Sequence, residues 1–352
     1  MRHILILYRP SEKRGGFAQA VCKIPKQIKR HKSRSCTGGV FFITRCTFSD
    51  YYQTFENQTG RLKKYGAQEH AMNTANKTLS FEFFPTRTPE GRDKQTAVRE
   101  KLRRFNPAFF SCTSGAGGST REGTLQTIAD ILAENTPAAP HLPCIGMNEA
   151  EIHTLLDTYR DMGVRRIVAL RGDMPSGMGA SGSGLRYAAE LVELIRHRYG
   201  DLFRIEIAAY PEYHPQARSA AEDTAHFAAK ARAGADSAIT QYFYNADAYF
   251  RFVDDVRTLG CTIPVVPGIM PVTGFAKLMR FSDTCGAEIP RWLRLKLQSY
   301  ADDTESVQAF ALDVVTDMCA RLLEQGAPGL HFYTMNQSAL PEEICRRLGF
   351  GA

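Results

Sequence analysis

The segment RIVALRGD, residues 166–173, joins an apolar, β-branched run to a polar Arg-Gly-Asp end. Such a run predicts a buried strand with polar groups at its carboxyl end. Seven other segments have a similar composition: LSFEFF (79–84), AFFSCT (108–113), PHLPCI (140–145), RIEIAAY (204–210), SAITQYF (237–243), IPVVPGI (263–269) and GLHFYTM (329–335). Most of the gaps between them are long enough for a helix and two turns. The alternation predicts an α/β fold, a single (β/α)8 TIM barrel.

Helix signals lie in the gaps between these runs. Asn148 with Glu151, and Ser219 with Glu222, have the spacing of a capping box, in which each residue satisfies a backbone N–H of the other. Further helices are expected over about 92–104, 122–134 and 186–199. The longest gap, before the last strand, is expected to hold three helices, which include 273–285 and 304–325.

Composition narrows the class of protein. The chain has 352 residues, of which 43% are hydrophobic, enough for one large domain and an appendage. Its apolar runs fall well short of the ~20 residues that a membrane span needs. The nine cysteines contain no CxxC pair, and no convincing secretion signal is present, so we expect reduced thiols in the cytoplasm. Four of them have apolar neighbours and are expected in the core: Cys112, Cys144, Cys261 and Cys319.

The charge is unevenly distributed along the chain. Residues 1–71 contain 14 Lys and Arg against 4 Asp and Glu, a net charge of +10. The remaining residues carry a net charge of −3, which gives the total of +7 for the chain. We expect two parts, a basic N-terminal extension over 1–71 and a barrel over 72–352. The extension shows little periodicity, which favours disorder over nucleic-acid binding. MNTANKTLSFEFF, from Met72, also reads like a natural start, so a mis-assigned start is the alternative.

Glu82 is the first candidate for chemistry. It stands between Phe81 and Phe83 in the first strand, so alternation places it on the opposite face from both rings. A carboxyl group enclosed by apolar walls is costly to ionise, and we therefore expect a raised pKa and a role as a general acid. The alternative is a structural carboxyl group that a buried partner satisfies.

Other polar groups follow the fourth and fifth strands. Arg171 and Asp173 are two residues apart, so both are expected on one face, either as a structural pair or as a ligand site. In AAYPEYHP, two prolines stiffen a turn that carries Tyr210, Glu212 and His214. With His141 these are metal-ligand types, but HxH and HExxH spacings are lacking and we expect no metal.

The helix after Ser219 places Asp223, His226, Phe227 and Lys230 on one stripe, either as a solvated face or as a phosphate site. Two glycine-rich stretches are more ambiguous. Gly177, Gly179 and Gly182 form a GxGxxG, but it does not directly follow a strand, which favours a mobile loop over a dinucleotide site. The turn at 115–118 directly follows the second strand, where it can let a ring or a phosphate approach the backbone.

Taken in order, several strings resemble the methylenetetrahydrofolate reductase family of the bacterial type: SFEFFPTRTPEG, APHLPCIG, IVALRGDMP, AAYPEYHPQA, AITQYFY, PGIMPV and HFYTMNQ. The resemblance spans about 78–350 and leaves out the basic extension. It implies a cytoplasmic flavoprotein on a (β/α)8 barrel that binds FAD, takes hydride from NADH or NADPH, and reduces 5,10-methylenetetrahydrofolate to 5-methyltetrahydrofolate for methionine synthesis. It also implies a ping-pong mechanism and a homo-oligomer, with neither nucleic acid nor membrane as a partner.

The resemblance assigns roles to individual residues. Glu82 matches the general acid, and Asp173 matches the aspartate beside the flavin that also holds the pterin. The residues implied to contact FAD are Thr113, Ala116, His141, Arg171, Gly172, Asp173, Tyr187, Ala188, Tyr210, His214, Ala217, Asp223, His226 and Lys230. Those implied to contact substrate are Asp173, Gln241 and Phe281, with Gln337 at the position where the family has an Arg for the folate tail. Lys277 is our candidate for the missing charge.

The sequence departs from the family pattern at Ser114, where an aromatic residue is expected, at His226, where Asn is expected, and at Ala229, where a basic residue is expected. Two other classes stay open at this stage. Another FAD-dependent barrel, such as a relative of proline dehydrogenase, would need neither Asp173 nor Gln241. A non-catalytic folate- or flavin-binding module would not require an acid at position 82.

Overall fold

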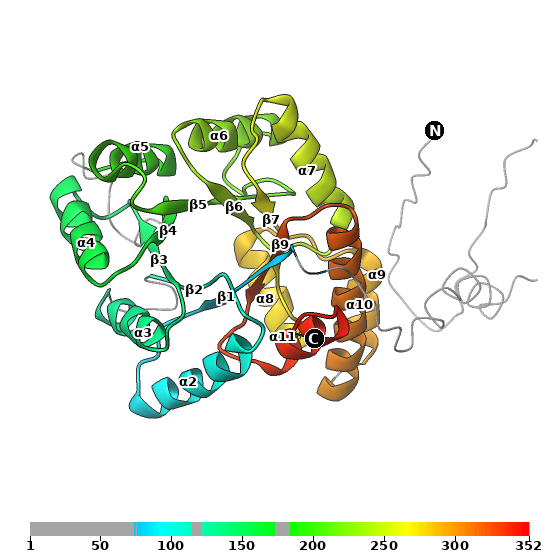
Figure 1. The fold of residues 1–352 in the computed structure, drawn as a ribbon. Coiled ribbons are helices and arrows are strands. Elements are labelled where there is room, and N and C mark those ends of the chain that lie inside the picture. The colour runs from blue at the N-terminus through cyan, green and yellow to red at the C-terminus, as the bar shows by residue number, and fades with distance from the viewer. Residues whose placement is uncertain (1–73, 75, 115–120, 173–183, 301, 352) are drawn as a thin grey trace, which may run out of the picture. The chain divides into compact units, whose positions relative to one another are not determined.

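The computed structural model describes residues 74, 76–114, 121–172, 184–300 and 302–351. These residues form an α/β barrel of parallel strands surrounded by helices (Figure 1). Its strands are β1 Thr78–Phe83, β2 Phe109–Cys112, β3 Ala138–Pro143, β4 Arg166–Leu170, β5 Arg204–Ala209, β6 Ser237–Thr240, β7 Val265–Val266, β8 Gly268–Ile269 and β9 Gly329–Tyr333. The (β/α)8 prediction is confirmed.

The nine strands occupy eight positions in the barrel. Neighbours follow the order β7-β6-β5-β4-β3-β2-β1-β9-β8, and every pair is parallel. β7 and β8 are two halves of the predicted seventh strand on either side of Pro267, which lacks the N–H that a central strand needs. β7 pairs with β6 and β8 with β9, so the split strand closes the circle. Gly268 fits there because a Cβ would lie 2.1 Å from the Thr240 carbonyl oxygen.

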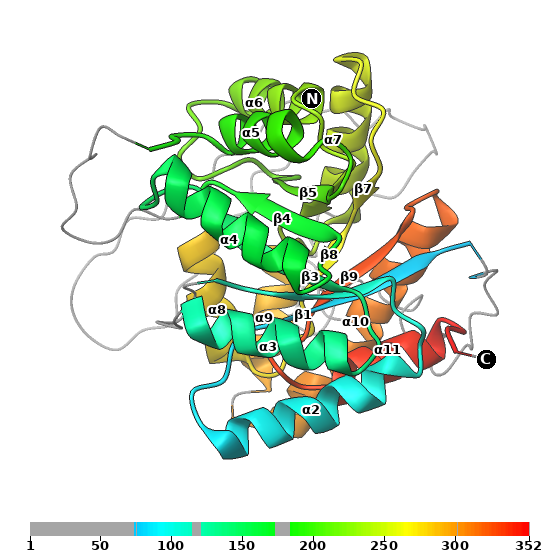
Figure 2. The same ribbon diagram turned by 60° about the vertical axis from the view of Figure 1, so that its left-hand side comes forward.

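Helices cover the outside of the sheet, as Figures 1 and 2 show from two directions. They are α2 Pro89–Arg103, α3 Arg121–Ala133, α4 Glu149–Asp161, α5 Ala188–Tyr199, α6 Ala220–Arg232, α7 Ala246–Thr258, α8 Phe275–Cys285, α9 Arg291–Ser299, α10 Thr304–Glu324 and α11 Ala339–Arg347. The three helices expected before the last strand are α8, α9 and α10. The predicted third strand began two residues late, because β3 starts at the small apolar pair Ala138 and Ala139 rather than at Pro140.

The two predicted capping boxes differ in outcome. At α4 both reciprocal hydrogen bonds are present, from Glu151 N–H to Asn148 Oδ1 and from Asn148 N–H to Glu151 Oε2. At α6 the Ser219 hydroxyl accepts from Glu222 N–H. The Glu222 carboxylate accepts from Arg218 N–H and pairs with the Arg218 guanidinium. The second box is therefore only half formed, because the arginine next to the cap attracts the carboxylate.

Side-chain alternation separates two cores. Leu79, Phe81 and Phe83 are buried in the large outer core that includes helix residues, and the Phe81 ring stacks on Phe332 with centroids 5.5 Å apart. The opposite face of the sheet fills the barrel and includes a cluster of Phe109, Ala139, Val168 and Ile239. The four cysteines expected in the core are buried: Cys112, Cys144, Cys261 and Cys319.

A charged group lies at the amino ends of the strands inside the barrel. Glu206, only 1% exposed, pairs with the Arg166 guanidinium and accepts a hydrogen bond from the Ser237 hydroxyl. The same guanidinium lies 4.5 Å from the centre of the Phe109 ring. Because these groups satisfy each other and sit at the end opposite the carboxyl ends of the strands, they belong to the stability of the barrel.

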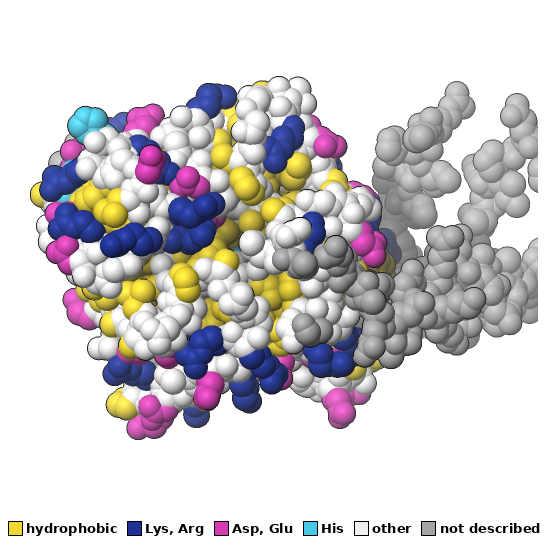
Figure 3. All heavy atoms as spheres, viewed as in Figure 1, with side chains coloured by type: hydrophobic (Ala, Val, Ile, Leu, Met, Phe, Trp, Pro, Cys, Tyr) yellow, Lys and Arg dark blue, Asp and Glu magenta, His cyan; other side chains and the backbone are white. Residues whose placement is uncertain are grey.

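On the face that Figure 3 presents, hydrophobic and uncharged atoms fill much of the middle, and groups of Lys, Arg, Asp and Glu side chains lie mainly around it. None of the helices within the described ranges is long and apolar enough to span a membrane. The predictions for the N-terminal extension, for the turn at 115–118 and for the GxGxxG at 177–182 all fall outside the described residues.

Candidate active site

Glu82 lies inside the barrel near the carboxyl ends of the strands, where its face of β1 meets β3 and β9. Its carboxylate Oε2 is 3.2 Å from His141 Nε2 and 3.7 Å from His331 Nε2. The Glu82 side chain is 17% exposed, while His331 is fully buried. Neither imidazole Nε2 has a hydrogen-bond partner of good geometry among the described residues. The arrangement therefore places one carboxylate oxygen against two imidazole rings.

The expected rise in the pKa of Glu82 is wrong. Burial does raise this pKa, but the attraction of the carboxylate to His141 and His331 outweighs burial and lowers it to about 2. The sequence argument counted the apolar neighbours of Glu82 within its own strand. It missed the two imidazoles, which reach the carboxylate only when β3 and β9 are placed on either side of β1 and β2.

His331 is oriented from behind by Ser80. The Ser80 hydroxyl lies 2.7 Å from His331 Nδ1, and both groups are buried. When the hydroxyl donates this hydrogen bond, the ring proton sits on Nε2, which faces the carboxylate of Glu82. Ser80, His331 and Glu82 thus form a line of polar groups across the adjacent strands β1 and β9.

The barrel mouth contains further polar atoms with no partner among the described residues. They are Ser111 Oγ and Thr113 Oγ1, both near the carboxyl end of β2. Ser111 is the register partner of Glu82. Buried polar atoms are ordinarily paired, so unpaired ones at the catalytic end of a barrel indicate a site that receives a ligand.

A cleft of about 930 Å³ opens at the carboxyl ends of β4 and β5, between α5 and α6. Ten of the residues expected to contact FAD line it: Arg171, Gly172, Tyr187, Ala188, Tyr210, His214, Ala217, Asp223, His226 and Lys230. These residues come from four separate stretches of the sequence. Their convergence on one cleft is a result of the tertiary structure.

Local contacts hold the two loops that form the cleft walls. After β5, Asp223 Oδ2 accepts from His214 N–H, and His214 Nδ1 accepts from Gln216 N–H. The Tyr210 and His214 rings meet edge to face with centroids 4.6 Å apart. Across the cleft, Arg171 donates to Gln216 Oε1 at 2.5 Å, which links the end of β4 to this loop.

The cleft has room for a dinucleotide such as FAD, and its lining carries three cations, Arg171, Arg218 and Lys230, together with the carboxylates of Glu190, Glu222 and Asp223. Gly172 lines it at φ +83°, and glycine is required there because a Cβ would lie 2.7 Å from Pro143. Lys230 donates to the Ala208 carbonyl oxygen, and burial lowers its pKa to about 8. Together with Arg171 it brings positive charge to a partly apolar wall. These residues therefore fit a dinucleotide with charged phosphates.

The other predicted residues occupy separate places. Thr113 and His141 lie beside Glu82 rather than in the lining of the cleft. Lys277 and Phe281 are one turn apart on α8, with Lys277 exposed and Phe281 partly buried. Gln241 follows β6, where its side-chain oxygen accepts from Tyr242 N–H, and exposed Gln337 follows β9. Ala116 and Asp173 lie outside the described residues.

Sequence reasoning missed several residues of this site. His331 and Ser80 were not chosen, although both lie in predicted strands and share the alternating face of Glu82. Their position on the same face of the strands as Glu82 could have identified them from the sequence. Gln216, Arg218 and Glu190 also line the cleft, and nothing in their local sequence distinguishes them from ordinary loop and helix residues.

The fold and the site together define the class of protein. It is a (β/α)8 barrel with an acid at the carboxyl ends of its strands and an adjacent cleft of ligand size, the arrangement of a barrel enzyme. A family model for methylenetetrahydrofolate reductase matches residues 67–349. The chain therefore belongs to the methylenetetrahydrofolate reductase family.

Individual relatives agree with this result. The chain is 39% identical over 273 residues to the 5,10-methylenetetrahydrofolate reductase of Salmonella typhimurium, which covers 77% of this chain and 90% of that protein. It is 38% identical to the Escherichia coli protein of the same name, with the same coverage. A methylenetetrahydrofolate reductase (NADH) of Arabidopsis thaliana is 36% identical, and the match covers 77% of this chain and 48% of that protein.

Among solved structures, an uncharacterized protein from Clostridium thermocellum that binds two copies of 5-methyl-5,6,7,8-tetrahydrofolic acid matches with a TM-score of 0.53. The match covers 78% of this chain and 96% of that one at 16% sequence identity. At that identity the likeness supports the fold alone.

Proposed function

We propose that this protein reduces 5,10-methylenetetrahydrofolate to 5-methyltetrahydrofolate with NADH or NADPH through bound FAD, in a ping-pong sequence. The observation that carries the proposal is the pairing of a family-matched acid, Glu82, with a cleft lined by ten family-matched positions. The match to the reductase family disfavours a relative of proline dehydrogenase. When bound, FAD would accept hydride from the nicotinamide and pass it to the folate.

In this proposal, different residues bind the cofactor and the substrate. Lys230 and Arg171 would hold the phosphates, and the bare backbone of Gly172 would let the dinucleotide lie close to the end of β4. Asp173, the next residue, is proposed to stabilise positive charge on the pterin. Gln241 and Phe281 are proposed to contact the folate or the nicotinamide, with Gln337 and Lys277 near the glutamate tail.

Glu82 is proposed to supply the proton that opens the imidazolidine ring of the folate to an iminium ion. Two opposing effects set its protonation: burial, which disfavours the carboxylate, and the two histidines, which favour it. A folate that covers the remaining exposed part of the side chain removes water and strengthens the first effect. A proton taken up from solvent would then reside on the Glu82 carboxylate when substrate is bound, ready for transfer to the folate nitrogen.

Anaerobic stopped-flow spectroscopy tests the proposal on the purified wild-type protein. The flavin absorbance should bleach with NADH or NADPH and recover when 5,10-methylenetetrahydrofolate is added. A protein that bleaches but recovers only with an imino acid would belong to another flavin-dependent class. A protein that binds folate without any flavin spectrum would be a binding module.

A further inference from the structure

The backbone beyond Glu82 is fixed by contacts that the proposed chemistry does not use. β1 and β9 pair as strands only as far as Glu82 and Tyr333. Beyond that point, the side chain of Asn336 replaces a strand. Phe84 N–H donates to Asn336 Oδ1 at 3.1 Å, and Asn336 Nδ2 donates to the Phe84 carbonyl oxygen at 2.9 Å. One side-chain amide therefore satisfies both polar groups of a single residue.

The backbone of Glu82, two residues before Phe84, is also held by the loop that follows β9. Thr334 Oγ1 donates to the Glu82 carbonyl oxygen at 2.6 Å, and Thr334 N–H approaches the same oxygen at 3.3 Å. Asn336 N–H in turn donates to Thr334 Oγ1 at 3.1 Å. The loop after β9 thus forms hydrogen bonds to the backbone of both neighbours of Phe83, Glu82 and Phe84.

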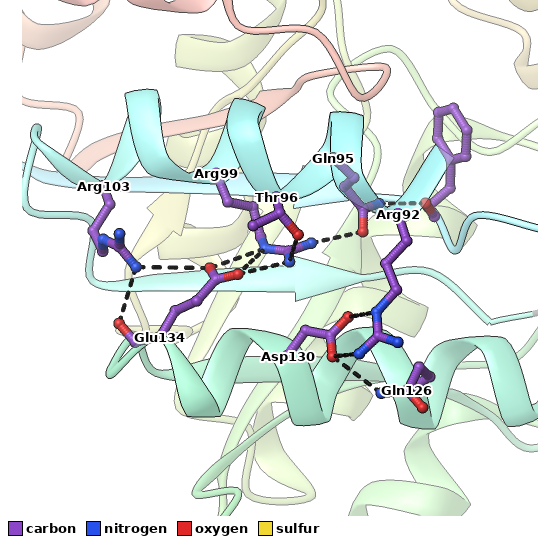
Figure 4. Close-up of polar contacts among 9 residues, drawn as sticks. Arg92, Gln95, Thr96, Arg99, Arg103, Gln126, Asp130 and Glu134 are labelled. Carbon is purple, nitrogen blue, oxygen red and sulfur yellow. Dashed lines mark hydrogen bonds and ion pairs between the residues drawn. The ribbon is translucent and has the colours of Figure 1, made fainter. Parts of the chain in front are cut away.

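A second support reaches Phe84 from the helix side. Gln95 of α2, 1% exposed, donates from Nε2 to the same Phe84 carbonyl oxygen at 2.8 Å. Gln95 is oriented by Arg99, whose Nη1 donates to Gln95 Oε1 at 2.7 Å. Arg99 is fully buried and pairs with Glu134, which follows α3 (Figure 4). The strand end is therefore connected through side chains to two helices.

The loop that carries Asn336 adopts a demanding conformation. Met335 and Asn336 have φ angles of +52° and +54°, the left-handed region that side chains other than Gly and Asn rarely adopt. Two consecutive residues in this region persist only when the surrounding contacts determine them. Here the conformation directs the Asn336 amide onto Phe84.

We infer that Asn336 is a positioning residue for Glu82: by pairing with the Phe84 backbone, it sets the distances from the carboxylate to His141 and His331. This inference rests on the proposed function. The carboxylate lies 3.2 Å and 3.7 Å from imidazole nitrogens on two other strands. Both distances therefore depend on where the end of β1 lies relative to β3 and β9.

Asn336→Gly is the decisive variant, because glycine keeps the left-handed backbone without strain and removes both hydrogen bonds. We expect flavin reduction by NADH to stay within about twofold of wild type. Reoxidation by 5,10-methylenetetrahydrofolate should slow about 10- to 100-fold, the scale expected for a misplaced catalytic group. The pH profile of reoxidation should move to higher pH, because weaker histidine contacts leave burial to raise the pKa of Glu82.

Two further variants separate positioning from general stability. Met335→Gly relieves the neighbouring backbone and leaves the Asn336 amide in place, so both half-reactions should match wild type. Gln95→Glu keeps an acceptor for Arg99 but removes the donor to Phe84, so it should slow reoxidation in the same direction as Asn336→Gly. This second variant keeps the test open if Asn336→Gly folds poorly.

One readout requires no turnover. In the wild-type protein the Phe84 amide should be protected from hydrogen exchange, and Asn336→Gly should remove that protection. If the wild-type protein itself is not reoxidised by the folate, the proposed function fails. Hydrogen exchange at the Phe84 amide still reports whether Asn336 holds the Phe84 backbone. If Asn336→Gly keeps the wild-type reoxidation rate and pH profile, the inference is overturned. Equal loss of both half-reactions with a lower Tm would overturn it as well, because that result indicates only stability.

Discussion

At the scale of single residues, the environment of Glu82 decides what it can do. Its two histidine neighbours keep the carboxyl group ionised until something displaces water from the barrel mouth. An acid of this kind depends on its surroundings for its proton, and so differs from a carboxyl group that burial alone keeps neutral. In the proposed mechanism, the proton transfer by Glu82 therefore depends on His141 and His331 as well.

Glu82→Gln should separate the two half-reactions. Glutamine keeps the size of the side chain but cannot donate a carboxylic proton, so reoxidation by 5,10-methylenetetrahydrofolate should fall by about 10²- to 10⁴-fold, the usual range for a lost general acid. Reduction by NADH should be nearly unchanged, which rapid-mixing absorbance spectroscopy would measure. Loss of both half-reactions together would contradict a dedicated acid role.

Lys230 should make FAD binding depend on pH. Burial lowers its pKa to about 8, so the ammonium group is present below pH 8 and is lost as the pH rises through that value. A phosphate binds the charged form, and the dissociation constant of FAD should therefore increase by up to about tenfold for each pH unit above 8. Fluorescence titration of the flavin-free protein would measure it.

The matched variants for this prediction are Lys230→Arg and Lys230→Met. Arginine keeps its charge throughout the range, so binding should stay level through pH 8, whereas methionine should weaken binding below pH 8 and also give a level profile. A wild-type protein with a level profile would show that Lys230 does not contact the phosphates.

Lys277 should contribute to folate binding. It is exposed on α8, one turn before Phe281, and the loop after β9 carries Gln337 where the family pattern has an arginine. Lys277→Ala should raise the KM for the folate about 3- to 10-fold without changing flavin reduction, because it removes one charge contact to a carboxylate tail. Steady-state kinetics would measure this, with Lys296→Ala on α9 as the control. An unchanged KM would remove Lys277 from the site.

At the scale of helices and strands, two ion pairs between the same parts of the barrel show how burial changes the contribution of an ion pair to stability. Arg99 pairs with Glu134 and has no exposed side-chain surface, whereas Arg92 pairs with Asp130 and is 49% exposed (Figure 4). Both connect α2 to the segment around α3. Only the first also supports the Gln95 contact to the end of β1.

Breaking these two pairs should have unequal effects. Glu134→Ala leaves the buried Arg99 guanidinium without its carboxylate, and the free energy of unfolding should fall by about 3 kcal/mol. Arg92→Ala removes a pair that solvent screens and should lower the free energy of unfolding far less. Urea denaturation followed by circular dichroism would measure both. Equal losses would mean that Arg99 finds water or another acceptor in the folded variant.

At the scale of the whole molecule, the described fold and the family match point to the same part of the chain. The first described contacts link Lys77 Nζ to the Ala327 carbonyl oxygen and Thr74 to Gly349, and the family model begins at residue 67. The first described contacts with the barrel therefore come from residues 74 and 77, just after the predicted boundary at 72. The role of residues 1–71 stays a prediction.

A variant that starts at Met72 should bind FAD and carry out both half-reactions at rates within about twofold of the full-length protein. The reason is that every contact described for the active site involves residues from 74 onward. Differential scanning calorimetry should give a similar Tm for the two forms. A truncated protein that fails to fold or to bind flavin would assign residues 1–71 a structural role.

The sequence by itself determined the barrel and the residues at the carboxyl ends of its strands. The alternation of apolar runs and helix signals is a local property, and so are the caps at Asn148 and Ser219, which allowed eight strands and most helices to be located. The resemblance to the family added the ten positions that line the cleft. The strand and helix predictions succeeded because each depends on neighbours along the chain. That the ten cleft positions contact FAD stays a prediction.

Only the tertiary structure decided the state of the acid. The pKa of Glu82 depends on His141 and His331, which belong to strands far along the chain, and on the exact approach of their rings to one carboxylate oxygen. The support of Phe84 by Asn336 and Gln95 likewise joins three distant segments. Electrostatic and hydrogen-bond energies vary steeply with distance and angle, and a sequence specifies those quantities only after it has folded.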